Sequence, residues 1–198
     1  MTALKIAEHT YGENLREYNA VLLHLGQMYL LIGDYPAAET MFRRGVAAEE
    51  KVAESDPVDR AIVRSSLAAA YIKQRKLVEA EPLILESREV TKSNCSAAPI
   101  ACSLVQSHVG EYYATKGQWA MAEMEFEAAL KLREDTLGEH PLVADSLISL
   151  ARVLRKVKRK GEAKTYEARA AQILSSQQNP LYDRSNTIDV RAFQAANR

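Results

Sequence analysis

Residues 25–42 read LGQMYLLIGDYPAAETMF, residues 67–84 read LAAAYIKQRKLVEAEPLI, and residues 109–126 read VGEYYATKGQWAMAEMEF. These stretches begin 42 residues apart and keep small, aromatic and apolar side chains in the same order, and a fourth copy follows one residue short. A fixed period of this length predicts an array of one supersecondary unit and argues against a compact enzyme with a single deep pocket. The recurring positions are Gly26, Ala68, Gly110 and Ala151; Tyr29, Tyr71 and Tyr113; Ala38, Ala80, Ala122 and Ala163; Phe42, Ile84 and Phe126; and Pro57, Pro99 and Pro141.

The second copy shows what one unit contains. Pro57 suits the first turn of a helix, where a missing backbone N–H is not needed. Apolar residues then recur at helical spacing until the polar pair at 75–76, and a second amphipathic helix begins at Leu77. The matching breaks in the first and third copies contain Gly33 and Gly117, and glycine is a common helix stop. Each unit is therefore predicted to be a helix-turn-helix, and the chain to be all-α.

The small residues of the repeat have a packing role in this prediction. Gly26 and its counterparts are expected where the two helices of a unit cross closely. Ala38 and its counterparts are expected to be the small residues on the second helix at the same contact. A larger side chain at either position would overpack the contact. The large residues, such as Phe42, are expected to fill the space toward the next unit.

The signature at the start of the first repeat, Leu25-Gly26-x-x-Tyr29 followed by Ala38 and Phe42, resembles that of tetratricopeptide repeats. The segment from Val109 to Phe126 repeats it. The period exceeds the usual value of about 34 residues, and the segments 79–83 and 137–141 look like the long-helix variety found in kinesin light chains and many bacterial proteins. This resemblance covers residues 3–174 and implies a right-handed superhelix, a solenoid with a concave groove that takes peptides.

The repeat phase divides the chain into an array and a tail. Residues 3–11 match 129–137 at three periods, so they are expected to form the second helix of a preceding repeat. Either a half-repeat caps the array or the chain is cut from a longer one. In the tail, apolar residues that include Phe193 are expected to dock on the last repeat. The predicted divisions are a half-repeat at 3–16, repeats at 17–56, 57–98, 99–140 and 141–174, and a tail at 175–198.

Composition narrows the classes of partner. The 198 residues contain 26 Lys and Arg against 26 Asp and Glu, which argues against bulk nucleic acid or an anionic membrane as the main partner. No apolar stretch approaches the roughly 20 residues that span a bilayer. No signal peptide precedes the first repeat, so a cytoplasmic protein is expected, although a removed leader would leave the same sequence.

The cysteines and histidines are expected to be structural, so no metal or cofactor is predicted. Cys95 and Cys102 flank Pro99, and we expect two free, small apolar side chains there. The alternative is a disulfide across the helix-helix turn, which would indicate an oxidising compartment. His24 and His108 occupy the same repeat position and are interpreted as a semi-buried polar site, with a shared ligand or metal as the alternative. His140 is expected to close a helix end.

No catalytic constellation or phosphate-binding loop is present, so a non-catalytic protein- or peptide-binding module is predicted. The alternative is a scaffolding or regulatory segment of a larger protein, whose array positions other domains. Self-association through open array ends or the tail is a further expectation. A basic run from Arg152 to Lys160 indicates an acidic partner segment at one end, or else a soluble end-face. The resemblance maps the groove onto Ala20, Leu23, Gln27, Leu30, Leu31, Ile62, Ser65, Ala69, Ile72, Lys73, Leu104, Ser107, Glu111, Thr115, Ile148, Arg152, Arg155 and Lys156.

Overall fold

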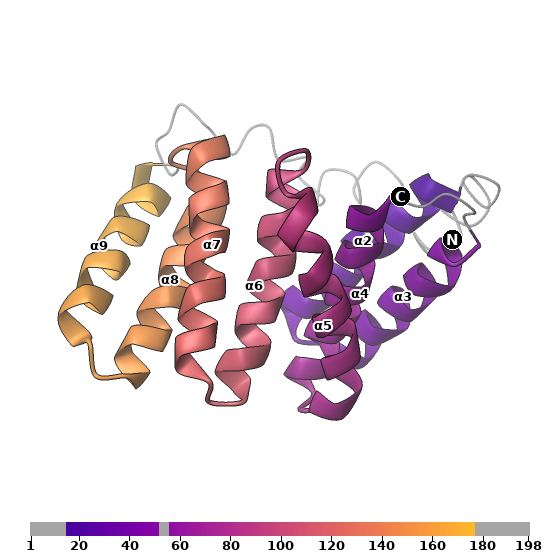
Figure 1. The fold of residues 1–198 in the computed structure, drawn as a ribbon, viewed down its shortest axis with the longest axis horizontal. Helices are drawn as coiled ribbons and strands as arrows, with labels where there is room; N and C mark the ends of the chain where they lie inside the picture. Colours follow the sequence, from indigo (N-terminus) through magenta and orange to yellow (C-terminus); the bar gives the residue numbers. More distant parts are fainter. Residues whose placement is uncertain (1–14, 52–55, 177–198) are drawn as a thin grey trace, which may run out of the picture.

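A computed structural model describes residues 15–51 and 56–176 of the chain. Within these residues it contains eight helices and no strand, and the helices stand side by side in a row from α2 and α3 to α9 (Figure 1). This confirms the predicted all-α array of helix pairs. The helices are α2 (Leu15–Ile32), α3 (Tyr35–Glu49), α4 (Pro57–Lys73), α5 (Leu77–Asn94), α6 (Pro99–Thr115), α7 (Trp119–Leu137), α8 (Pro141–Lys156) and α9 (Lys160–Ser176).

The helix starts follow the local signals in the sequence. Pro57, Pro99 and Pro141 each stand at the first position of the first helix of a repeat, where the fixed φ of proline suits the helix. Before α4, the Asp56 carboxylate accepts a hydrogen bond from the Val58 N–H at 2.7 Å. This cap satisfies a backbone donor that the first turn leaves without a helical partner.

The turn inside every repeat contains one residue in the left-handed region of φ. Gly33 and Gly117 have φ values of 81° and 74°, as expected of glycine. The corresponding residues of the second and fourth repeats are Arg75 and Lys158, with φ values of 63° and 68°. The turn conformation is therefore common to all four repeats, although only two of them use the residue that adopts it without strain.

The recurring small residues do mark the close contact inside a repeat. A Cβ atom added to Gly26 would lie 2.4 Å from Cε1 of Phe42, and one added to Gly110 would lie 2.7 Å from Cε1 of Phe126. Glycine thus makes room for a phenylalanine ring in its own repeat. The expectation that Phe42 points toward the next unit is therefore wrong. Its ring packs against Gly26 of the same repeat, in the space that a Cβ atom would otherwise occupy.

Successive repeats share one apolar core. Each second helix packs against the first helix of the next repeat, and α4 also packs against α6. Buried residues from Ala38 in α3 to Ile173 in α9 belong to a single cluster. A chain of nearest-neighbour interfaces of this kind is how repeat arrays gain their stability.

Buried polar groups distinguish one junction between repeats from another. Glu49 ends α3 and receives a hydrogen bond from Nη1 of Arg64 at 2.7 Å. Two periods later, buried Arg133 donates to Oγ of Ser146 at 2.8 Å and to the Leu142 carbonyl oxygen at 2.9 Å. Groups buried away from water need such partners, and the partners differ between these two junctions.

The outer divisions predicted from the phase stay predictions. Helix α2 begins at Leu15, two residues before the predicted start of its repeat, and α9 ends at Ser176. The half-repeat helix at 3–11 lies outside the described residues. So do the apolar tail residues Ile188, Val190 and Phe193.

Candidate protein-binding surface

The residues predicted to line a groove all lie on the first helices of the four repeats, and they divide into three classes of exposure. Ala20, Leu31, Lys73, Ile148, Arg152, Arg155 and Lys156 are exposed. Leu23, Gln27, Leu30, Ile62, Leu104, Ser107, Glu111 and Thr115 are half-buried. These fifteen residues are called the first-helix face below. Ser65, Ala69 and Ile72 are buried.

The three buried residues belong to the core, so they cannot meet a ligand as predicted. They lie on α4, whose run of small side chains lets α6 approach closely. The Ser65 hydroxyl contacts Nδ1 of His108 on α6 at 3.2 Å and donates to the Ile62 carbonyl oxygen at 3.1 Å. The helical spacing gave no measure of how fully α6 covers this side of α4.

One acidic residue joins three successive repeats on the first-helix face. Oε2 of Glu111 on α6 lies 3.7 Å from Nζ of Lys73 on α4, and its other oxygen accepts a hydrogen bond from Arg152 on α8. All three residues were predicted to share a groove, and the structure brings them together. Because both cations remain about half exposed, a ligand carboxylate has access to them in competition with Glu111.

The basic run is partly neutralised by neighbouring glutamates. Arg155 donates from Nε to Glu167 at 2.6 Å, and Arg159 donates from Nη1 to Glu123 at 2.5 Å. The hydrogen bond from Arg155 lowers the pKa of the Glu167 carboxyl. Among the described residues, Lys156, Lys158 and Lys160 take part in none of these ion pairs. The positive charge free to attract an acidic partner is therefore smaller than the sequence indicates.

A ladder of ion pairs on the second helices was missed by the sequence reasoning. Glu39 and Glu81 each face a lysine of the following repeat, Lys76 at 2.7 Å and Lys116 at 3.3 Å. The pair of Glu123 and Arg159 continues the series. The three glutamates recur at 42 residues in the sequence, a signal that would have found them. These pairs connect neighbouring repeats across the junctions.

The histidines have separate surroundings. His24 is exposed on α2, whereas His108 is half-buried on α6, and burial lowers the pKa of His108 to about 4. As expected, His140 closes a helix end, since its Nδ1 accepts a hydrogen bond from the Leu142 N–H at 3.2 Å. Within the part of the chain that the structure describes, no three His, Cys, Asp or Glu side chains gather as metal ligands would.

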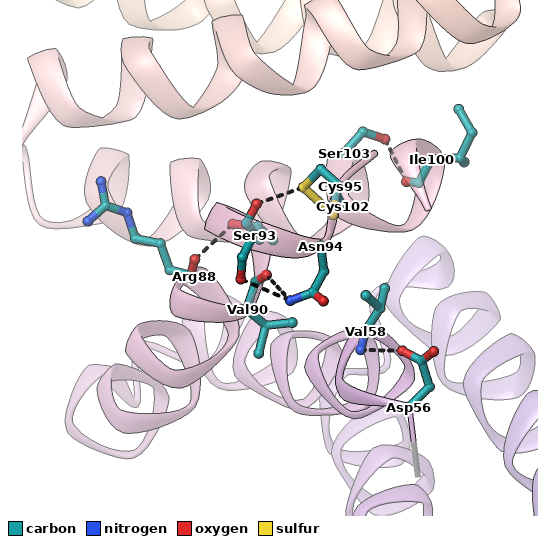
Figure 2. The surroundings of a disulfide bond; sticks show 11 residues. Asp56, Val58, Arg88, Val90, Ser93, Asn94, Cys95, Ile100, Cys102 and Ser103 are labelled. Atoms are coloured by element: carbon teal, nitrogen blue, oxygen red, sulfur yellow. Dashed lines mark hydrogen bonds between the residues drawn. A yellow bond between two sulfur atoms is a disulfide. The ribbon is translucent and has the colours of Figure 1, made fainter. Parts of the chain in front are cut away.

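The cysteines differ from the favoured expectation. Cys95 and Cys102 form a disulfide across the turn between α5 and α6 (Figure 2), so neither is a free thiol. The turn brings their Cα atoms to 5.5 Å, a usual separation for a disulfide. The expectation of two free side chains was wrong because spacing along the chain does not show how closely a turn returns on itself.

Comparisons with known proteins bear on the fold. Residues 99–176 match the family model for the tetratricopeptide repeat. No curated protein matches the chain in sequence. In the described ranges, no helix is both long and apolar enough to cross a bilayer.

Solved structures of repeat proteins are similar to the chain at low sequence identity. A putative kinesin light chain of Podosopora anserina with nearly identical TPR-like repeats is 22% identical, with a TM-score of 0.60 over 89% of this chain and 87% of that one. BtubC (BKLC) from P. vanneervenii is 13% identical, with a TM-score of 0.56 over 89% of each chain. The apo form of RapI is 17% identical, with a TM-score of 0.67 over 92% of this chain and 66% of that one. The chain therefore shares the fold of these repeat proteins, and its residues 99–176 match the tetratricopeptide-repeat family.

Proposed function

We propose that the chain is a non-catalytic module that binds a protein or peptide segment on the first-helix face. The observation that carries the proposal is the contact of Glu111 with Lys73 and Arg152, which joins three repeats on a face reached by solvent. Solenoids bind partners along extended surfaces made by successive repeats. The side chains of this face have the mixture that such binding needs: apolar groups such as Leu31, and ionic groups that fix orientation.

The face also indicates the chemistry of its ligand. Its α2 end is apolar around Leu31, and its α8 end carries Arg152 and Lys156. A segment with apolar residues at one end and acidic residues at the other would complement both. The acidic end would compete with Glu111 for Arg152, so its contribution is expected to be modest and to fade with salt.

Matched substitutions test this proposal. Peptides selected from a displayed random library against the full chain would be measured by fluorescence anisotropy with variants of equal exposure. Leu31 and Val78 are 82% and 84% exposed, on a first and a second helix respectively. Ile148 and Leu85 form a second pair, at 46% and 49%. Leu31→Asp and Ile148→Asp should weaken binding about tenfold or more, whereas Val78→Asp and Leu85→Asp should leave it unchanged.

Equal losses in both members of each pair would contradict binding on the first-helix face. Failure of every selected peptide to saturate would favour the alternative, an array that only positions other domains of a larger protein. The charge preference is read from the same peptides. Acidic peptides should bind less tightly as salt rises, and Glu111→Gln should increase their affinity by freeing Lys73 and Arg152.

A further inference from the structure

One side of α2 is apolar and partly exposed, although three of its four positions are buried in every later repeat. This outer stripe of α2 consists of Val21, Leu25, Met28 and Ile32, spaced so that they share one face of the helix. Met28 is 59% exposed and Ile32 is 71% exposed. The counterparts of the first three positions are all buried, and they are Val63, Leu67 and Ala70 in α4, Val105, Val109 and Tyr112 in α6, and Ser146, Leu150 and Val153 in α8.

The later repeats show what covers this stripe. A Cβ added to Gly45 of α3 would meet Val63 at 3.3 Å. At the fourth stripe position, Gln74 donates to Glu39 of α3 at 2.8 Å, and Lys116 pairs with Glu81 of α5 at 3.3 Å. The stripe is therefore where the second helix of a preceding repeat packs, and it is separate from the first-helix face.

The repeat phase does not assign residues 3–11 to the exposed half of the stripe. These residues match 129–137, and in that segment Arg133 contacts Leu142 and Ser146 near the beginning of α8. The other half of α7 contains Glu123, which pairs with Arg159 beyond the end of α8. By this phase, residues 3–11 correspond to the half of α7 that lies near the beginning of α8, whereas Met28 and Ile32 correspond to positions near its end.

Charge indicates the nature of a helix that would cover Met28 and Ile32. In the later repeats, a glutamate near the start of the covering helix meets a cation at the next turn, as Glu39 meets Lys76 and Glu123 meets Arg159. The first repeat has Asp34 at the position of these cations. We propose that the outer stripe of α2 binds an amphipathic helix of a partner protein, with an apolar stripe for Met28 and Ile32 and a basic residue in its first turn opposite Asp34.

A peptide copied from α3, with the charge of one glutamate reversed, serves as the probe. A labelled peptide of residues 35–49 contains the covering helix of the next junction, and its E39K version places a cation where Asp34 would face it. Against the full chain, the E39K peptide should bind at least threefold more tightly than the native peptide at low salt. Asp34→Asn keeps an oxygen that can cap α3 but removes the charge, so it should abolish this preference.

Further variants show whether the peptide lies on the stripe. Met28→Glu should abolish binding of both peptides, and Val78→Glu on α5 should not, with circular dichroism confirming that both variants fold. Binding that survives Met28→Glu, a preference that survives Asp34→Asn, or absence of saturation by either peptide would overturn the proposal. Sedimentation of the chain alone adds another test, because dimers that Met28→Glu dissociates would assign the stripe to a second copy instead of a partner.

Discussion

The two ends of the described array expose different chemistry. Helix α2 presents Met28, Leu31 and Ile32 to solvent, whereas α9 presents mainly charged, polar and small side chains, with Leu174 as its one exposed large apolar residue. The end repeats of a solenoid need polar outer faces to stay soluble. Helix α9 meets that requirement and ends the described array, while the exposed side of α2 has the composition of a surface that another helix covers.

The largest expected effect on unfolding free energy comes from substituting the same repeat position inside the array and at its α2 end. Tyr112 on α6 is buried, its hydroxyl accepts a hydrogen bond from Nζ of Lys116 at 3.1 Å, and it corresponds to exposed Met28. Tyr112→Ala should lower the free energy of unfolding by about 3–5 kcal/mol, whereas Met28→Ala should change it by less than about 0.5 kcal/mol. Urea denaturation measures both. Equal losses would mean that Met28 is already covered in the isolated chain.

Reducing the disulfide is a second way to compare the inside of the array with its α2 end. Reduction of the bond between Cys95 and Cys102 should cost about 2–3 kcal/mol of unfolding free energy, because the bond closes a short loop in the unfolded chain. Denaturation with and without dithiothreitol would show the loss, and a variant with alanine at both positions should not respond to the reductant. Hydrogen exchange in α2 should be unchanged, so faster exchange there on reduction would contradict a local role.

Lowering the pH is expected to have a smaller effect on the free energy of unfolding. His24 on the end helix α2 serves as the control for His108. Burial holds the pKa of His108 at about 4, below its ordinary value of 6.5, so the folded protein resists the proton that the unfolded chain accepts. His108 therefore contributes stability that is present above pH 6.5 and is lost as the pH falls through 4, by about 2 kcal/mol. His108→Gln should flatten this part of the stability profile and exposed His24→Gln should not. Identical profiles for both variants would show that burial of His108 is not the cause.

The sequence predicted the fold because its recurring residues are packing residues. Gly26 and Phe42 meet inside one repeat, and that contact recurs with Gly110 and Phe126, so the period itself records the helix pair. What the period does not record is the direction of a side chain, and Phe42 was for that reason assigned to the wrong neighbour.

The candidate surface was less predictable than the fold. Helical spacing placed Lys73, Glu111 and Arg152 on one side, and the structure joins them. Spacing could not show that Ser65 is sealed by α6, or that Arg155 is already paired with Glu167, because both depend on distances between helices. Periodicity defines which side of a helix a residue occupies, and only the packed array defines whether that side is open.

Hydrogen exchange of the full chain, with and without a peptide selected from the library, tests the central claim most directly. The claim is that a partner segment lies along the first helices. Binding should slow exchange in α2, α4, α6 and α8 and leave α5, α7 and α9 unchanged. Slowing confined to the second helices, with the first helices unaffected, would contradict the account.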